Sequence, residues 1–424
     1  MAMYSETKNT ILVTGATGFL GKVVVEELLR LRDKHATSQV VLLLRKKDPL
    51  DAQARFEQHV APSPCFASLP KDWKRSIRVI EGDLSSPNCG LQAGEYELVC
   101  QTTTHIIHTA ACIKFDSTVP EAISSNIDSS CHILDLARKC VNLQRLVITS
   151  TAYVTPPQQG PIYERLVELP CPASQIVSGL RRGIIGKEEA IAATGHPNIY
   201  SLSKCLAEHL ISETRGSLPI TIVRPSIICA AIENPSPGWI DSRAAFGGLA
   251  LGFATGSLRV LHGRPEAKLD IVPVDLVASC LIYETFRRDI GSLDERNLRI
   301  VFSVATKEKS ITLGDACKML EQYFGGRFRY IGPQGPILDL YLLFHQYIPS
   351  RIYATMCRIK GNERGETQAQ KTWKVVRGMN NVFKPYTNHT HDFRPKGSSI
   401  DFDPAKYMNL ICQGVHTNLM DSKL

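Results

Sequence analysis

The fold is decided near the N-terminus by the stretch Thr10-Ile-Leu-Val-Thr-Gly-Ala-Thr-Gly-Phe-Leu-Gly-Lys-Val-Val-Val-Glu-Glu-Leu-Leu-Arg30. Residues 11–13 are a short apolar run that is typical of a buried parallel strand. Gly15, Gly18 and Gly21 follow, and the apolar residues after them recur at helical spacing. A strand, a glycine turn and a helix in this order bring backbone N–H groups and the positive end of a helix to a pyrophosphate. The stretch therefore predicts a dinucleotide site; the alternative is an ordinary tight strand-to-helix turn.

The residues that we expect to contact the dinucleotide at this turn are Gly15, Thr17, Gly18, Phe19, Leu20 and Gly21. The second apolar run, residues 39–47, indicates which dinucleotide is bound. It ends in Arg45, Lys46 and Lys47, whereas a site for NAD usually has a carboxylate here for the ribose 2′-OH. Three cations suit a 2′-phosphate, and the planar fork of Arg45 pairs well with phosphate oxygens. We therefore expect NADP(H), bound through Arg45; the alternative is a basic loop without a ligand.

Four further apolar runs extend the pattern. They cover residues 77–84, 105–111, 146–154 and 220–225, and helical patterns such as residues 129–139 and 202–214 separate them. Alternating strands and helices predict an α/β fold with a doubly wound parallel sheet. Ligands bind at the carboxyl ends of such strands. There the fourth run offers the small residues Ala110 and Ala111, which let a ribose lie close, and the fifth offers the hydroxyls of Ser150 and Thr151.

Tyr200 and Lys204 are four residues apart, and on a helix such residues lie one above the other on a single face. An ammonium beside a phenol favours the phenolate and lowers the pKa of the phenol. Such a phenol can give or take a proton at a carbonyl or hydroxyl. Taken alone the pair could be solvated helix surface, but the glycine stretch favours a catalytic interpretation.

These motifs together resemble the extended short-chain dehydrogenase/reductase superfamily and, within it, the fatty acyl-CoA reductases. The general matches are the glycine stretch, Asp83-Leu84, Ala110-Ala111, Ser150-Thr151 and the pair Tyr200 and Lys204. The narrower matches are residues 21–30, Phe115-Asp116, residues 197–209, and Arg224-Pro-Ser-Ile-Ile followed by Pro237-Gly-Trp-Ile-Asp241. The resemblance covers residues 8–305 and continues more faintly through Trp373, Asn380-Asn381 and residues 400–407.

The resemblance implies a role for each matching residue. Tyr200 would be the acid/base, Lys204 would lower its pKa and bind the nicotinamide ribose, and Thr151 would bind the reacting carbonyl oxygen. Ser150 is the alternative to Thr151, because a slip of one residue along a strand turns the other hydroxyl inward. Asn126 matches a helix asparagine of the superfamily, although Ser129 and Ser130 replace the usual Gly-Thr. The remaining cofactor contacts implied are Asp83, Leu84, Ala110, Ala111 and Pro225.

The activity implied is NADPH-dependent reduction of a fatty acyl-CoA to the aldehyde and on to the primary alcohol, with release of coenzyme A. One alternative is an extended short-chain reductase or epimerase that acts on a sugar nucleotide, a polyketide or a carrier-bound acyl thioester. Another is a non-catalytic NADP-sensing module, against which Tyr200 and Lys204 argue. No metal is expected, because His389-Thr-His391-Asp392 is typical of an exposed polar turn.

Length and composition suit this interpretation. The chain has 424 residues, of which 43% are hydrophobic, enough for a large core. We expect a Rossmann-like NADP-binding domain over residues 1–305, with a proline-rich insertion between Thr155 and His196, and a smaller, mainly helical domain over residues 306–421. The formal charge of +8 could help to attract anionic phosphates, but evenly spread surface cations would give the same value. No charge block or finger motif indicates nucleic-acid binding.

The thirteen cysteines are scattered without a Cys-x-x-Cys motif, which is typical of reduced, buried thiols. No apolar run is long enough to predict a transmembrane segment. Residues 337–348 are expected to be a helix in the core of the second domain; contact with a membrane surface and a part in an acyl tunnel are the alternatives. The last residues, Ser422-Lys423-Leu424, match the peptide that the peroxisomal import receptor binds. They predict a protein of the peroxisomal matrix.

Overall fold

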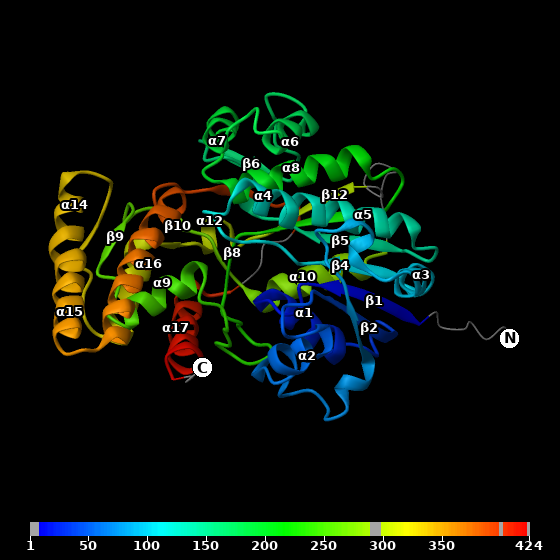
Figure 1. Cartoon of the computed structure of the whole chain (residues 1–424), viewed down its shortest axis with the longest axis horizontal. Helices are drawn as coiled ribbons and strands as arrows, with labels where there is room; N and C mark the ends of the chain where they lie inside the picture. Colours follow the sequence, from blue (N-terminus) through cyan, green and yellow to red (C-terminus); the bar gives the residue numbers. More distant parts are fainter. Residues whose placement is uncertain (1–7, 289–297, 398–401, 422–424) are drawn as a thin grey trace.

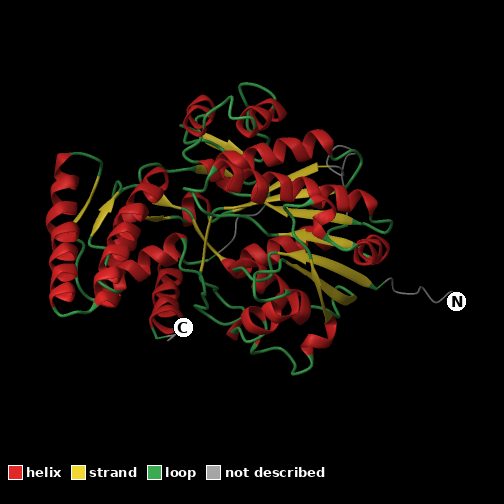
Figure 2. Ribbon diagram, viewed as in Figure 1, coloured by secondary structure: helices red, strands yellow, loops and turns green. Residues whose placement is uncertain are grey.

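The computed structural model describes residues 8–288, 298–397 and 402–421, and inside the helix of residues 363–387 it describes only part of the side chains. Ser422-Lys423-Leu424, the expected peroxisomal address, lies outside the described residues. A seven-stranded sheet forms the centre of the molecule, and every neighbouring pair of strands is parallel (Figures 1 and 2). The order β12-β7-β5-β4-β1-β2-β3 is that of a doubly wound sheet, so the predicted fold class is confirmed.

The strands begin and end close to the predicted limits. They are β1 (Asn9–Thr14), β2 (Thr37–Leu44), β3 (Ile77–Glu81), β4 (His105–His108), β5 (Arg145–Thr149), β7 (Ile220–Pro225) and β12 (Leu298–Ser303). The strand at the edge, β12, was not predicted and pairs along the whole of β7. The fifth strand ends at Thr149, five residues earlier than expected, because the Thr151 side chain accepts a hydrogen bond from the Tyr153 N–H and starts a 3₁₀ turn over Ala152–Val154.

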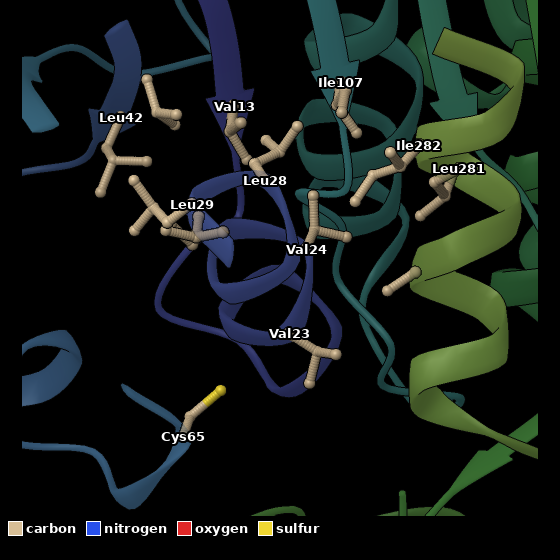
Figure 3. Packing of buried hydrophobic residues seen from close by; sticks show 14 of the residues in the cluster. Val13, Val23, Val24, Leu28, Leu29, Leu42, Cys65, Ile107, Leu281 and Ile282 are labelled. Atoms are coloured by element: carbon tan, nitrogen blue, oxygen red, sulfur yellow. The ribbon is translucent and has the colours of Figure 1, made fainter. Parts of the chain in front are cut away.

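Helices cover both faces of the sheet, and the alternation of side chains along each strand divides the core between them. On one face, α1 (Phe19–Arg30) and α10 (Val274–Phe286) pack on Val13, Leu42 and Ile107 (Figure 3). On the other face, α3 (Ala93–Thr102), α5 (Ser129–Lys139) and α8 (Ile199–Thr214) pack on Leu12, Val41 and Ile106, among others. Each central strand is therefore buried on both sides, as its continuous apolar sequence predicts.

The helix that carries Tyr200 begins three residues earlier than the sequence pattern predicts. Asn198 is its N-cap, and the Asn198 side-chain oxygen accepts hydrogen bonds from the N–H of Ser201 at 2.9 Å and from its hydroxyl at 2.8 Å. An asparagine at this place satisfies N–H groups that the helix itself leaves unpaired. Tyr200 therefore lies in the first turn of α8, at the end of the helix nearest the cap.

A second hydrophobic core combines residues that come before position 305 in the sequence with residues that come after it. It joins residues of α9 (Ala245–Ala254), β8 (Ile227–Cys229) and β9 (Val260–His262) with residues of α13 (Leu313–Phe324) and α17 (Pro404–Gly414). The insertion after β5 forms β6 (Pro161–Tyr163), α6 (Ala173–Arg181) and α7 (Lys187–Thr194), and β6 pairs with β15 (Asp392–Arg394). The Glu164 carboxylate strengthens this link, because it accepts hydrogen bonds from the N–H groups of Phe302 at 2.7 Å and Lys396 at 3.1 Å.

The rest of the C-terminal region is helical, as expected. It consists mainly of α14 (Pro336–Leu342), η7 (Leu343–Tyr347), α15 (Ile348–Ile359) and α16 (Glu363–Thr387), which stand at one end of the molecule (Figure 1). The expectation that residues 337–348 are core is wrong: Ile337 is 58% exposed and Phe344 is 58% exposed, because only one side of this helix packs on the protein. None of the helices in the described ranges is long and apolar enough to cross a membrane.

All thirteen cysteines are free thiols, and nine of them are buried. His391 differs from the prediction of an exposed turn, because its ring is buried against Tyr153 and Phe393, and burial lowers its pKa to about 4. His389 is exposed. Within the described part of the chain, no group of three or more His, Cys, Asp or Glu side chains is placed to hold a metal ion.

Candidate active site

The glycine turn joins β1 to α1 at the carboxyl end of the sheet. Gly15 has φ +80°, and a Cβ atom there would lie 2.5 Å from Thr109 Oγ1. A Cβ atom at Gly21 would lie 2.1 Å from the carbonyl oxygen of Gly15. Only glycine fits at either place, so the turn and the start of α1 are in close contact. No side chain caps the first N–H groups of α1, whose N-cap is Gly18, and these groups are free to bind an anionic ligand.

The ends of β1 and β4 are tied together beside this turn. Thr14 Oγ1 lies 2.9 Å from His108 Nδ1 and accepts a hydrogen bond from the Ala110 N–H at 3.3 Å, while the Thr109 hydroxyl donates to the Thr14 carbonyl at 2.7 Å. Burial, with a contribution from the charge of Lys204, lowers the pKa of His108 to about 3, so this ring is neutral. The bonds place Ala110 and Ala111 next to the glycine turn, as the sequence predicts.

The other expected cofactor contacts follow β3 and β7. Asp83 Oδ1 accepts hydrogen bonds from the Ser85 N–H at 3.0 Å and its hydroxyl at 2.8 Å, and the Leu84 carbonyl bonds His132 Nδ1 at 2.8 Å. Pro225 is the last residue of β7 and pairs with Ser303 of β12. Asp83 and Leu84 thus follow the outer strand β3, and Pro225 ends β7 near the other border of the sheet, all at the carboxyl ends of parallel strands, where ligands bind in such folds.

Two guanidinium groups lie at the end of β2. Arg45 is exposed, and the Arg55 guanidinium donates a hydrogen bond to the Arg45 carbonyl. Burial and the positive charge of Arg45 lower the pKa of Arg55. Three acids lie nearby: Asp48 pairs with Lys46 at 3.2 Å, Asp51 caps α2 (Ala52–Arg55), and Glu81 accepts a hydrogen bond from the Ala52 N–H at 3.1 Å. The place therefore carries a surplus of positive charge and fits a phosphate group.

Helix α8 presents Tyr200, Lys204 and Glu208 at a spacing of four residues. Lys204 Nζ donates to the carbonyl oxygen of Thr149, the last residue of β5, at 2.9 Å. One turn further on, Glu208 binds Arg224 of β7 through two hydrogen bonds, of 2.9 Å and 2.5 Å, and Arg224 is completely buried. These bonds hold the helix on the sheet, so the position of Tyr200 is determined by the strand ends beneath it.

Tyr200 is half-buried, and the Thr151 side chain lies close enough to its phenol to lower the pKa of Tyr200 by hydrogen bonding. Ser150 Oγ, by contrast, is buried and has no hydrogen-bond partner among the described residues. The structure thus brings Thr151, the first choice of the sequence analysis, and not its alternative Ser150, to the phenol. The extended backbone of Thr151 turns its side chain toward α8 before the 3₁₀ turn begins.

The pKa of Tyr200 differs from the expectation. Burial raises it above its ordinary value, the neighbouring Tyr386 raises it further, and only the hydrogen bond with Thr151 lowers it. The expected lowering by Lys204 is absent, because the ammonium group donates to the Thr149 carbonyl instead. Burial lowers the pKa of Lys204 itself to about 8, and the carboxylate of Glu208 opposes this shift.

Asn126 has a structural part in the site. It lies in η5 (Ile123–Asp128), where its side chain exchanges hydrogen bonds with the N–H and carbonyl of Cys112, at 2.9 Å and 3.1 Å, and donates to Ser203 Oγ at 2.9 Å. The Asn126 carbonyl accepts a hydrogen bond from the Ser130 hydroxyl at 2.7 Å. Asn126 therefore joins the segment after β4 to α8, and Ser130, which replaces a threonine of the superfamily pattern, supplies a hydroxyl of its own.

Aromatic side chains that the sequence analysis did not assign to the site surround Tyr200. Phe115 meets it edge-on, with ring centroids 5.4 Å apart, and Tyr386 of α16 lies 5.7 Å from Phe115 and 4.6 Å from Tyr153. The Tyr386 hydroxyl accepts a hydrogen bond from Asn198 Nδ2 at 3.2 Å. Phe115 stood out in the sequence only as part of a family motif, and no local pattern connects Tyr386 with α8.

Two buried acids hold the loops that border the site. Asp275 accepts hydrogen bonds from the N–H groups of Ile232, Glu233 and Asn234, at 3.0, 2.8 and 3.0 Å. Asp270 accepts from the Ser226 hydroxyl at 2.6 Å and the Ala305 N–H at 2.8 Å, and burial raises its pKa to about 6. The segment after β7 is thus fixed by side chains from the segment before α10 and from the first turn of α10.

Comparison with known proteins identifies the family. The sequence matches the male sterility protein family of NAD-binding domains over residues 13–281. Among curated relatives, the fatty acyl-CoA reductase wat of Drosophila melanogaster is 29% identical over 410 residues, which are 93% of this chain and 77% of that protein. Human fatty acyl-CoA reductase 1 is 32% identical over 282 residues, which are 65% of this chain. The match spans only about half of the human protein, 54% of its length.

Solved structures share the fold over almost the whole chain. The terminal R domain of the myxalamid PKS-NRPS pathway superposes with a TM-score of 0.66 at 20% identity and covers 97% of this chain and 91% of that domain. The reductase domain of a nonribosomal peptide synthetase from Mycobacterium tuberculosis reaches a TM-score of 0.62 at 18% identity and covers 97% and 92%. At these identities the likeness concerns the fold alone. From the family match and the curated relatives together, the chain belongs to the male sterility protein family and, within it, to the fatty acyl-CoA reductases.

Proposed function

We propose that this protein reduces a fatty acyl-CoA thioester with NADPH to the aldehyde and on to the primary alcohol, with release of coenzyme A. The observation that carries the proposal is the placement of Thr151 beside the Tyr200 phenol, on a helix that Lys204 ties to the carboxyl end of β5. This pair lies on the same edge of the sheet as the glycine turn. The names of the curated relatives support the acyl-CoA substrate.

The geometry suggests how these residues act. The hydroxyls of Thr151 and Tyr200 can both donate to the carbonyl oxygen of a thioester, and such fixed donors stabilise the negative charge that develops there. When bound, NADPH supplies the hydride. Because burial raises its pKa, Tyr200 is protonated at the start and can act as the acid. Loss of the coenzyme A thiol from the resulting hemithioacetal leaves an aldehyde, whose carbonyl the same two hydroxyls can hold for a second reduction.

The choice of NADPH rests on the charge at the end of β2. Arg45 and Arg55 lie close together, and Asp51 and Glu81 make hydrogen bonds with backbone N–H groups instead of facing the place of a ribose. Replacing Arg45 by glutamate should weaken NADPH binding by roughly tenfold or more, because hydrogen bonds between charged groups contribute about 1.5–3 kcal/mol. NADH binding should change less. Equal losses for both cofactors in fluorescence titrations would contradict the assignment.

The activity is tested with purified protein, NADPH and a panel of substrates. We expect NADPH oxidation with fatty acyl-CoAs and none with sugar nucleotides, two NADPH consumed per acyl-CoA, and a primary alcohol in the mass spectrum. Tyr200→Phe should lower kcat by about 10²- to 10⁴-fold, as expected for loss of a positioned acid, whereas Tyr163→Phe, an exposed control, should not. Turnover of a carrier-bound thioester or a sugar nucleotide alone would replace the proposal by one of its alternatives.

We also propose that Ser422-Lys423-Leu424, where it is the free C-terminus, directs the protein to the peroxisomal matrix through the import receptor. The test is to express the chain with an N-terminal fluorescent tag in cultured cells, with and without these three residues. Punctate signal that coincides with a peroxisomal marker should appear only with the residues present. The same distribution for both would contradict the address.

A further inference from the structure

One end of the molecule carries an unusual concentration of exposed apolar side chains. The elements α14, η7 and α15 follow one another without a break and form a single helical column over residues 336–359 (Figure 1). Of the large hydrophobic residues that are exposed in the described ranges, nine out of sixteen lie in this column, and Ile359 is 81% exposed. They are Ile337, Leu340, Leu343, Phe344, Tyr347, Ile352, Tyr353, Met356 and Ile359.

The exposed apolar residues keep to one side of the column. Ile337, Leu340 and Phe344 have helical spacing in the first half, and Ile352, Met356 and Ile359 have it in the second half. In a plain α-helix the two sets would point in different directions. The π-helical turn η7 lies between them and takes up one extra residue, which rotates the second half back into line with the first.

The opposite side of the column packs on the protein. Leu338, Gln346, Ala354 and Cys357 are buried there, and the column contacts β9, β14 (Tyr330–Gly332) and α16. The apolar stripe therefore faces away from the body of the molecule. A helix whose outward side is apolar over its whole length usually meets another apolar phase or partner.

The charges on the column indicate which partner this is. Arg351, Arg358 and Lys360 are exposed beside the stripe, whereas Asp339 is the one acid in residues 336–360. Such a combination of an apolar stripe and basic flanks attracts an anionic lipid surface. A second copy would offer these three cations only Asp339 of its own column as an acidic partner.

We propose that the column of residues 336–359 lies flat on an anionic lipid bilayer, with the apolar stripe among the acyl chains near the headgroups and Arg351, Arg358 and Lys360 against lipid phosphates. Phe344 and Tyr353 suit this depth, because aromatic rings favour the interface between water and lipid. The proposal does not depend on the reaction that the protein catalyses.

The experiment is flotation of the full-length chain with vesicles of phosphatidylcholine alone or with phosphatidylserine added. We expect the protein to bind the vesicles that contain phosphatidylserine, and to bind the vesicles of phosphatidylcholine alone more weakly. Replacing Leu340, Phe344 and Ile359 by serine should weaken binding by at least about tenfold, since each large apolar side chain that leaves water contributes strongly. Replacing Arg351, Arg358 and Lys360 by glutamine should cost roughly fivefold for each cation, and should do so only on the anionic vesicles.

The matched control replaces Val141, Ile184 and Tyr283 by serine, because these side chains are as exposed but lie elsewhere on the surface. It should bind vesicles as the unaltered chain does, and circular dichroism should show that all variants are folded. Failure to float with anionic vesicles, or equal binding by the stripe variant, would overturn the proposal. Light scattering could also show that the unaltered chain is a dimer and that only the stripe variant is a monomer. That result would overturn the proposal too, because the stripe would then contact a second copy.

Discussion

The strands at the centre of the sheet and the column of residues 336–359 are both rich in apolar side chains, but they differ in what covers them. Ile11, Leu12 and Val13 are completely buried, because helices pack on both faces of the sheet. In the column only one side is buried, and the large apolar residues of the other side are exposed. A similar apolar content thus serves folding in one region and, by our proposal, lipid contact in the other.

The candidate active site lies where the two parts of the chain meet. The strand ends supply the glycine turn and Thr151, and α8 supplies Lys204, whereas α16 supplies Tyr386, which packs among the aromatic rings around Tyr200. Apolar content alone therefore does not tell which residues of this protein are buried, and substitutions in the two regions should differ in their effects on stability and activity.

The buried ion pair of Arg224 and Glu208 should be the most sensitive point of the sheet region. Arg224→Ala leaves the Glu208 carboxylate buried without its partner, so the free energy of unfolding should fall by about 3–5 kcal/mol. Lys74→Ala breaks an ion pair of similar length whose side chains are 46% and 45% exposed, and should cost at most about 1 kcal/mol. Urea unfolding measures both. Equal losses would mean that Arg224 does not anchor α8.

Truncation of apolar side chains should also cost more stability in the sheet region than in the column. Leu28 of α1 is completely buried in the cluster of Figure 3, and Leu28→Ala should destabilise the protein by about 2–5 kcal/mol. Ile359→Ala in the column should change the stability by no more than about 0.5 kcal/mol, because that side chain is exposed. A comparable loss of stability for Ile359→Ala would show that the column is covered in solution, and would contradict the difference between the two regions.

Tyr386→Phe tests the contact between the two parts of the chain. It removes the hydroxyl that accepts a hydrogen bond from Asn198 Nδ2, at the cap of α8, and should cost about 0.5–1.5 kcal/mol of stability. Tyr323→Phe removes a hydroxyl from a partly exposed ring and should change the stability by no more than about 0.5 kcal/mol. Urea unfolding of the two variants measures the difference, and equal losses would show that the Tyr386 hydroxyl does not help to join α16 to α8.

The titration of Lys204 should have a smaller effect, which is a change of kcat/KM with pH. Its pKa is lowered to about 8, so the ammonium that helps to hold the site is about half lost at that pH, and kcat/KM should fall as the pH rises through this value. The stability contribution of this group runs the other way. Between about 8 and the ordinary value of 10.5 the unfolded chain binds more protons than the folded one, so this contribution rises with pH. A loss of activity that follows unfolding would therefore contradict the assignment.

Much of the fold was predictable because its signals are local. The glycine turn, the apolar runs and the spacing of Tyr200 and Lys204 each lie within one or two turns of the chain, and the sheet and α8 agree with them. The edge strand β12 was missed, as was the burial of His391, since both depend on neighbours that are distant in sequence. Whether Thr151 or Ser150 turns its hydroxyl toward Tyr200 also depends on distant neighbours, so the sequence alone does not decide between them.

The glycine turn and the apolar runs predict a parallel sheet with a dinucleotide site, because both signals are local. The structure gives the reason for the glycines, since a Cβ atom at Gly15 or Gly21 would collide with neighbouring atoms. The packing of distant segments, in contrast, brings Thr151 rather than Ser150 to Tyr200, places Tyr386 beside them, and turns the apolar side of residues 336–359 outward. A local pattern states which side of an element is apolar. What that side meets depends on how distant segments pack, and no short stretch of sequence contains that information.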